Sequence, residues 1–299
     1  MSTTPRPLVH AKRIGPTLTP DRSRVLMRPF YPSTDDIARR IVARVSALSD
    51  EEVARLLAQV LGDFEDRHEN VPQIFRNRFL QVRRYLREAR AYSPERQALI
   101  GAHFTHEYSP ESAALFNPSI VPHPDQTGLP KGALRFILSL RATGEGHISS
   151  ITFRTGAVSA QNRITLTPPA AFAAEPERVP NAAYDQPLFT RKLQELGVLN
   201  DFSRAVLGQL PETFTLDDLH RVLALALQNA DPADATTALG ERGILLLAES
   251  NYEVRFAAGS TVSQRIIFPS TPSQSNGIED ARFVRFQEDD GRTTHYATY

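Results

Sequence analysis

LRFILSLRATGEGHISSITFRTG, residues 134 to 156, decides how the rest of the sequence is interpreted. Two runs of β-branched, aromatic and other apolar residues flank the glycine-bearing connection 143–146. Such runs joined by a short glycine-rich turn are typical of a β-hairpin, because glycine adopts turn conformations without steric cost. The stretch therefore predicts two antiparallel strands, over 134–142 and 147–156.

Other short runs with the same character lie around this hairpin. They are NRITLTPP (162–169), SNYEVRFA (250–257), QRIIFPS (264–270), ARFVRF (281–286) and THYATY (294–299). A glycine-bearing turn joins the last two into a second predicted hairpin. Strands and helices do not alternate as a parallel βαβ sheet requires, and no glycine-rich loop of the dinucleotide or Walker type appears. The pattern favours a short-stranded antiparallel sheet, sandwich or propeller blade.

Helical patterns precede and interrupt these strands. STDD (33–36) and SDEE (49–52) each place a serine N-cap, Ser33 and Ser49, three residues before an acid, and the second introduces apolar residues at helical spacing. A third helix is expected over 71–91. Helices return from 185 to about 230, where Thr215 precedes Asp218 at capping-box spacing.

The chain is expected to divide into three parts. Residues 1–31 form a basic arm rich in proline and threonine, too polar to order itself alone, and expected to lie on some other surface. Residues 32–108 form a helical extension. Residues 109–299 supply the strands, with a helical insertion at about 185–240. The fold class is mixed α and β.

Composition excludes several functions. Thirty-four basic residues balance thirty-four acidic ones, so no overall field attracts nucleic acid or a membrane surface. The absence of cysteine excludes disulfides, thiolate nucleophiles and thiolate metal sites. The sequence has no run of about 18 apolar residues and no apolar core of a signal peptide. A cytoplasmic protein without a membrane partner is predicted.

The third predicted helix is strongly basic. Its arginines are Arg76, Arg78, Arg83, Arg84, Arg87 and Arg90. A nucleic-acid surface is one interpretation, with salt-sensitive binding as its signature. A solvated face packed near the acidic helix that begins at Asp50 is favoured, since runs of charge are usually solvated. No nucleic-acid partner is therefore expected.

Several motifs carry a resemblance to a known family. They are LFNPSIVPHPDQ (115–126), FILSLRATGEGHISSITFRTG (136–156), LLLAESNYEVRF (245–256), QRIIFPS (264–270) and GIEDARFVRF with DGRTTHYATY (277–299). Their order along residues 100–299 resembles the opening part of glycoside hydrolase family 130, the mannoside phosphorylases and related mannosidases. The resemblance implies a five-bladed β-propeller that binds sugar at the mouth of its channel, with helical extensions in some members.

The strands after residue 134 suffice for one blade and the start of a second. We therefore expect the first part of a propeller, interrupted by the helical insertion and incomplete, as in a truncated product. The phosphate-holding residues of the family would then lie beyond Tyr299. An incomplete propeller exposes strand edges, which favours aggregation or complementation by another chain.

The family motif at the start of the second predicted hairpin is an aspartate followed two residues later by arginine. It matches Asp280 and Arg282, with Ala281 where proline is usual. The resemblance implies that Asp280 is the general acid of an inverting phosphorolysis, in which inorganic phosphate attacks a β-mannoside and mannose 1-phosphate is released. In the family the proton is thought to pass through a sugar hydroxyl. In an extended segment Glu279 would point to the opposite face, so the two carboxylates are not paired. The alternative for Asp280 is a turn residue.

The resemblance implies further substrate contacts. They are Asn117, Arg141, His147, Ser149, Ser250, Asn251, Glu253 and Arg282. The Asn-Pro pair at 117 is also a common turn signal, and Arg141 also fits a surface arginine at a strand end. His147 and Ser149 lie on the return limb of the first hairpin, where alternate side chains share a face. A polar strand start equally explains the three residues at 250–253.

Other functions stay open at this stage. The first alternative is a β-mannosidase of the same family, and the second is an inactive fragment or sugar-binding module. No metal is expected: His103, His106 and Glu107 share a short stretch, but zinc would require further ligands. The expected partners are a β-mannoside oligosaccharide and phosphate, with no other cofactor. The N-terminal helices offer a surface for a homo-oligomer.

Overall fold

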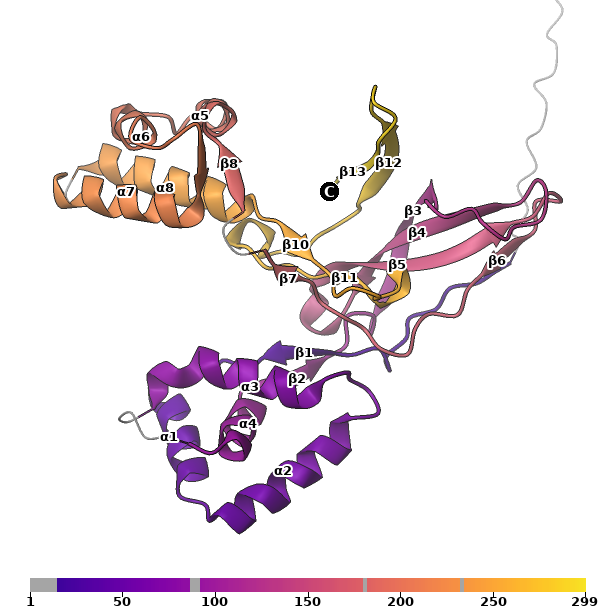
Figure 1. Ribbon diagram of the computed structural model, residues 1–299, viewed down its shortest axis with the longest axis horizontal. Coiled ribbons are helices and arrows are strands. Elements are labelled where there is room, and N and C mark those ends of the chain that lie inside the picture. Colours follow the sequence, from indigo (N-terminus) through magenta and orange to yellow (C-terminus); the bar gives the residue numbers. More distant parts are fainter. Residues whose placement is uncertain (1–14, 87–91, 180–181, 232–233) are drawn as a thin grey trace, which may run out of the picture.

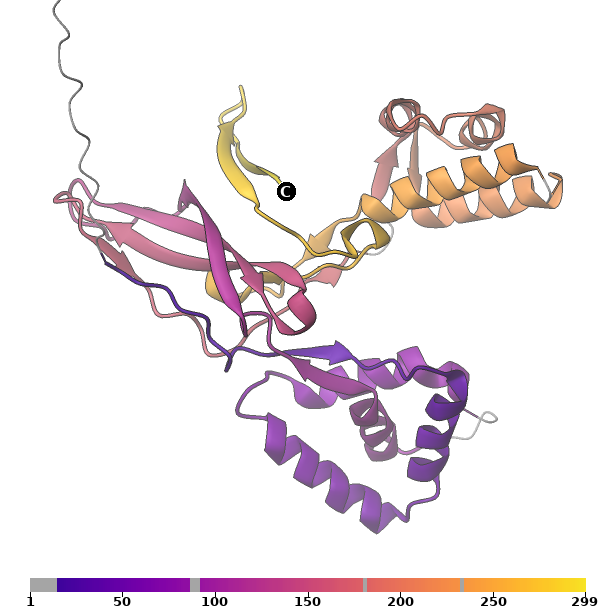
Figure 2. The same ribbon diagram turned by 180° about the vertical axis from the view of Figure 1, so that it is seen from behind.

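The computed structural model describes residues 15–86, 92–179, 182–231 and 234–299. Four parts can be distinguished (Figure 1): a helical unit (α1–α4), a central sheet, a helical insertion (α5–α8) and a C-terminal hairpin. Seen from behind, in Figure 2, the helical unit and the insertion again lie well apart, each attached to the region of the sheet. None of the described helices is long and apolar enough to cross a membrane.

Within its described residues, the helical unit consists of four α-helices and a 3₁₀ turn. They are α1 (Asp35–Ser46), α2 (Asp50–Phe64), α3 (Val71–Val82), the turn Arg83–Tyr85 and α4 (Pro94–His103). The capping box predicted for α2 is confirmed, with Ser49 and Glu52 bonding each other's backbone N–H groups. The predicted cap of α1 is wrong by one residue: Thr34, not Ser33, accepts the N–H of Ile37.

The basic third helix differs from its prediction in two ways. α3 ends at Val82, because the 3₁₀ turn follows, and residues 87–91 of the predicted helix lie outside the described residues. Arg78 does not belong to a solvated face. It is buried, and its Nη1 donates to Gln81 at 2.5 Å.

Part of the N-terminal arm is ordered against the protein. Residues 1–14 lie outside the described residues, but β1 (Leu26–Pro29) pairs antiparallel with β2 (Thr105–Tyr108). The side chain of Leu26 is buried there. The strand pair fastens the arm to the region between the helical unit and the central sheet.

The central sheet confirms the first predicted hairpin. Its strands are β3 (Ala114–Pro122), β4 (Leu134–Thr143), β5 (Ser149–Val158), β6 (Ile164–Leu166) and β11 (Ile266–Ile267). The order is β11-β5-β4-β3, with β6 also paired to β5, and all pairs are antiparallel. Because Arg141 lies opposite Ile151 and Leu138 opposite Arg154, these two pairs point to opposite faces. We call the face with Arg141 the front face and that with Arg154 the back face.

The helical insertion has its own core. Its elements are β8 (Ala183–Asp185), α5 (Gln186–Glu195), α6 (Asp201–Leu207), β9 (Thr213–Thr215), α7 (Leu216–Gln228) and α8 (Ala235–Ser250). The capping box of Thr215 with Asp218 is confirmed. The strand expected over 250–257 is mostly wrong, because Ser250 ends α8 and only β10 (Val254–Arg255) is extended, pairing with β7 (Glu177–Arg178).

The second predicted hairpin is also confirmed. β12 (Arg282–Gln287) and β13 (Thr293–Thr298) pair antiparallel as the C-terminal hairpin. Short 3₁₀ turns at Val262–Gln264 and Pro272–Gln274 precede it. β12 lies beside β3, where the N–H of Phe283 donates to Ser119 Oγ at 2.9 Å. The fold is thus mixed α and β with antiparallel sheets, and none of the sheets within the described ranges closes on itself.

Candidate functional site

The loop that carries Asp280 is held against the end of β5. The N–H of Ile278 donates to the carbonyl of Ser149 at 2.9 Å. Gly277 has φ of +107°, and a Cβ there would lie 2.9 Å from the backbone nitrogen of Ser149, so only glycine permits this approach. Asp280 follows with φ of +53°, a left-handed conformation that turns the chain into β12.

A bulge in β3 directs Asn117 toward the same loop. The register with β4 shifts between Phe116 and Ser119, and Asn117 has φ of +52°. Its amide Nδ2 donates to Asp280 Oδ1. The irregular backbone at the Asn-Pro pair therefore directs the Asn117 amide toward Asp280, and the sugar contact of Asn117 stays a prediction.

Arg141 joins the two carboxylates. Its Nη1 donates to Asp280 Oδ1 at 3.3 Å, and its Nη2 to Glu279 Oε1 at 2.5 Å. Its Nε donates to Ser149 Oγ at 3.0 Å, and the guanidinium carbon lies 4.9 Å from the ring centre of Phe116. The expectation that Glu279 points away from Asp280 is wrong, because the left-handed conformation of Asp280 breaks the strand alternation.

Arg282 completes the cluster through the backbone of the bulge. Its Nη1 donates to the carbonyl of Asn117 at 3.0 Å. We call the following group the Asp280 site: Asn117, Arg141, Ser149, Glu279, Asp280 and Arg282. Sequence reasoning named all of them, but it assigned no contact to Glu279.

The Asp280 site is open to solvent. The side chains of Asp280 and Glu279 are 51% and 49% exposed, whereas that of Arg141 is 20% exposed. The hydrogen bond from Asn117, with a smaller contribution from Arg141, lowers the pKa of Asp280 below its ordinary value of 3.8. Asp280 is therefore a carboxylate at neutral pH. With two acids and two arginines, the site suits a neutral polar ligand that both donates and accepts hydrogen bonds.

The other predicted contacts lie elsewhere and stay predictions. His147, with φ of +61°, is exposed and makes no side-chain hydrogen bond or ion pair within the described residues. Ser250, Asn251 and Glu253 line a separate pocket of about 500 Å³ beside α5 and α8. Asn251 donates from Nδ2 to the Leu247 carbonyl at 2.7 Å.

The histidine-rich stretch around Glu107 forms a different contact from a metal site. Glu107 Oε1 accepts from Arg67 Nε at 2.9 Å and lies 2.7 Å from Nε2 of the buried His68. Across the part of the chain that the structure describes, no group of three or more histidine, aspartate or glutamate side chains is arranged to hold a metal ion.

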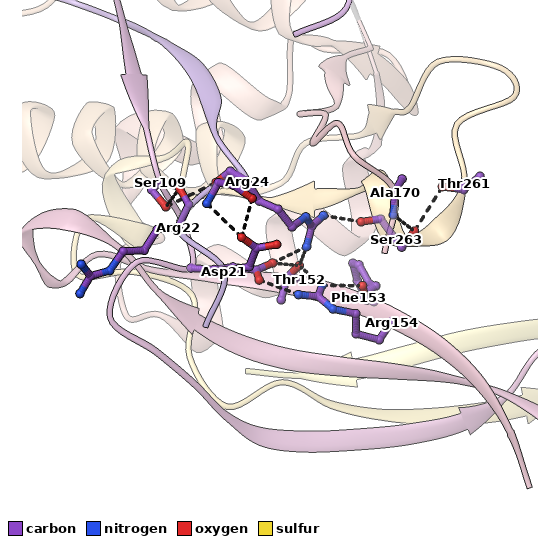
Figure 3. Close-up of polar contacts among 12 residues, drawn as sticks. Asp21, Arg22, Arg24, Ser109, Thr152, Phe153, Arg154, Ala170, Thr261 and Ser263 are labelled. Carbon is purple, nitrogen blue, oxygen red and sulfur yellow. Dashed lines mark hydrogen bonds and ion pairs between the residues drawn. The ribbon is translucent and has the colours of Figure 1, made fainter. Parts of the chain in front are cut away.

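A second arginine–carboxylate cluster lies on the back face, and sequence reasoning missed it. Figure 3 shows Arg24 from the arm beside β5, where its Nη1 donates to Thr152 Oγ1 at 3.2 Å and Arg154 Nη1 donates to the same hydroxyl at 3.1 Å. Glu111 joins them: Arg24 Nη1 donates to Glu111 Oε1, and Arg154 Nη2 donates to Glu111 Oε2 at 2.5 Å. We call Arg24, Glu111, Thr152 and Arg154 the buried ionic cluster.

The buried ionic cluster is closed to solvent. The side chains of Arg24, Glu111 and Arg154 are 2%, 0% and 3% exposed. Burial lowers the pKa of Arg24, although the charge of Glu111 opposes this effect. Arg24 also donates to the carbonyl of Ser263. The only sequence signal for this cluster was the basic character of the arm.

Comparison with known proteins adds no relative. No protein-family model matches the sequence, and no curated protein or solved structure does.

Proposed function

We propose that the Asp280 site binds a β-mannoside and that Asp280 serves as general acid in an inverting glycoside phosphorylase of the family 130 type. One observation supports this proposal above the others. Asn117, Arg141 and Asp280 come from stretches far apart in the sequence, yet their side chains are in hydrogen-bond contact. These are the positions that the resemblance to the family had selected.

The chemistry follows from the donors and acceptors present. Oδ2 of Asp280 and Oε2 of Glu279 accept no hydrogen bond within the described residues, so both are available to sugar hydroxyls. Arg141 offers a fixed fork of donors to ring substituents or to a phosphate oxygen. Phosphate attacks the anomeric carbon from the face opposite the leaving group, and the glycosidic oxygen takes a proton that originates at Asp280 and passes through a sugar hydroxyl.

A requirement on the protonation of Asp280 follows. A general acid must hold a proton when the substrate is bound, whereas Asn117 and Arg141 stabilise the charged form. A sugar hydroxyl that displaces the Asn117 amide from Oδ1 and accepts a hydrogen bond from the acid, instead of donating one, removes the largest of these contributions. Binding of substrate would then raise the pKa of Asp280 and prepare it for proton transfer.

The second candidate is a sugar-binding module without turnover. The lowered pKa of Asp280 and the exposed position of both carboxylates favour it, because catalytic acids usually lie in sites that exclude water. A β-mannosidase is the third, and it differs in using water in place of phosphate.

The test uses Asp280→Asn, with Asp289→Asn as control, since Asp289 is an exposed turn residue without a side-chain partner in the described part of the chain. Release of mannose 1-phosphate from a panel of β-linked mannobioses is measured with and without phosphate. Loss of the acid should lower kcat by about 10²–10⁴. Sugar binding should persist, because Asn retains the shape and an acceptor oxygen.

The other possible outcomes either favour one of the alternative functions or refute part of the proposal. Turnover without phosphate by the parent protein would indicate a mannosidase. Mannobiose binding without turnover, unchanged in Asp280→Asn, would indicate the binding module. Full activity in Asp280→Asn would remove Asp280 from the mechanism, and absence of mannoside binding would refute the proposal as a whole.

A further inference from the structure

A pocket of about 220 Å³ lies between the front face and the C-terminal hairpin. The sheet contributes Ile137 and Phe153, the hairpin contributes Phe283, and the segment before β11 contributes Phe256 and Val262. These walls are predominantly apolar. The volume is below the range of about 300–1,000 Å³ that drug-sized ligands occupy, so any occupant is small.

Arg265 provides a positive charge at this apolar pocket. Its Nη2 donates to the carbonyl of Ser260 at 3.0 Å and its Nε to Ser260 Oγ at 3.3 Å, while the guanidinium stacks on Phe256 at 5.3 Å. It has no carboxylate partner within the described ranges, and its Nη1 donates to no described atom. A half-buried arginine of this kind retains unused capacity for an anion.

His295 supplies a second, independent observation. Its Nε2 atom is buried and has no hydrogen-bond partner among the described residues. The ring lines the pocket from β13. His295 lies opposite Arg285 of β12, and Arg285 is two residues from Phe283, so both share one face of that strand. His295 and Phe283 therefore lie on the same face of the hairpin. Buried polar atoms are rarely left without a partner, so an orphan atom at a cavity indicates an occupant that hydrogen-bonds to it.

From these three features we infer that the pocket binds a small apolar monocarboxylate, with a single aromatic ring or short aliphatic chain. The carboxylate would pair with Arg265, and the apolar part would lie against the phenylalanines. His295 Nε2 would complete the hydrogen bonding of the carboxylate. This inference is independent of the proposed function, since it uses none of the residues of the Asp280 site.

The test compares an acid with its uncharged isostere. Binding of 3-phenylpropionate and of 3-phenylpropionamide to the full chain is measured by calorimetry at one pH. The acid should bind about tenfold more tightly, because a hydrogen bond to a charged group is stronger than one to a neutral group. Arg265→Gln should remove this preference, whereas Arg163→Gln should retain it, because Arg163 is exposed and its side chain makes no hydrogen bond or ion pair in the described chain.

A second variant locates the site. Ile137→Phe adds volume at the pocket wall and should abolish binding of both compounds, while circular dichroism and thermal unfolding verify that the variant is folded. Equal affinity for acid and amide, unchanged selectivity in Arg265→Gln, or undiminished binding by folded Ile137→Phe would each overturn the inference. So would failure of the parent protein to bind either compound, which would leave water as the partner of His295.

Discussion

The two faces of strands β4 and β5 each carry an arginine–carboxylate cluster, but the clusters differ in access to solvent. On the back face, Glu111 is fully buried, and each of its carboxylate oxygens accepts a hydrogen bond from an arginine. On the front face, Arg141 contacts Glu279 and Asp280 through one oxygen of each, and both acids are about half exposed. Both carboxylate oxygens of Glu111 are thus used on the back face, whereas one oxygen of each acid is unused on the front face.

This difference in exposure leads to different expectations for mutations on the two faces. A buried ion pair is weak evidence of net stabilisation, because desolvation offsets much of the attraction, but removal of one partner leaves a buried charge unpaired. An exposed pair contributes little to stability. Unused oxygens beside a rigid arginine are available to a ligand. We therefore expect mutations on the back face to affect folding and mutations on the front face to affect binding.

Glu111→Gln should have the largest effect. The substitution leaves the buried guanidinium groups of Arg24 and Arg154 without their anion, and the free energy of unfolding should fall by about 3–5 kcal/mol. Urea denaturation measures it. Glu279→Gln, the matched change on the front face, should alter the denaturation midpoint far less; equal losses in the two variants would contradict the comparison.

Arg24→Met should have a smaller effect, localised to the arm. Glu111 keeps Arg154 and Thr152 as partners, so the expected loss is about 1.5–3 kcal/mol. Hydrogen exchange of β1 amides should accelerate more than that of β4 amides. Arg22→Met is the control, because Arg22 is exposed and its side chain donates, among the residues that the structure describes, only to the carbonyl of Ser112. If both variants exchange alike, Arg24 does not fasten the arm.

Asn117→Gly should have the smallest effect on stability. It tests the hydrogen bond from Asn117 to Asp280 on the front face. Loss of the amide donor should raise the pKa of Asp280 toward 3.8, as followed by carboxyl NMR titration. A depressed pKa stabilises the folded state above the unfolded-state pKa, and this stabilisation is lost as pH falls through the folded-state pKa. The variant should therefore show a flatter dependence of stability on pH in the acid range.

Asn162→Gly serves as the control for this change. Asn162 also has a positive φ, of +60°, but its side chain makes no hydrogen bond within the described residues. The backbone consequences of the two substitutions are therefore similar. If Asn162→Gly shifts the pKa of Asp280 as much as Asn117→Gly does, the hydrogen bond is not the cause.

Local signals in the sequence predicted much of the fold. Capping boxes at Ser49 and Thr215 and both β-hairpins were recognisable because each depends on neighbouring residues. Helix α8 was missed, since Gly240 and Gly243 disfavour an isolated helix. They are required by packing: a Cβ at Gly240 would lie 2.7 Å from Asn200 Oδ1, and one at Gly243 would lie 2.8 Å from Val198.

The two clusters were predictable to different degrees. Family resemblance selected Asp280, Asn117 and Arg141, but the pairing of Glu279 with Arg141 depends on the left-handed backbone of Asp280, which strand alternation does not anticipate. The buried ionic cluster depends on partners far apart in the chain. Neither Arg24 nor Glu111 carries a local pattern that identifies the other.

The position of Arg24 also has a consequence for biosynthesis. A ribosome synthesises Arg24 87 residues before Glu111, 128 before Thr152 and 239 before Ser263, the three residues to which its side chain donates hydrogen bonds. None of these three partners has been synthesised while the helical unit emerges, so the guanidinium of Arg24 stays hydrated at that point. The contacts of the Arg24 side chain are therefore complete only after residue 263 has been synthesised, although β1 can pair with β2 as soon as residues 105–108 are present.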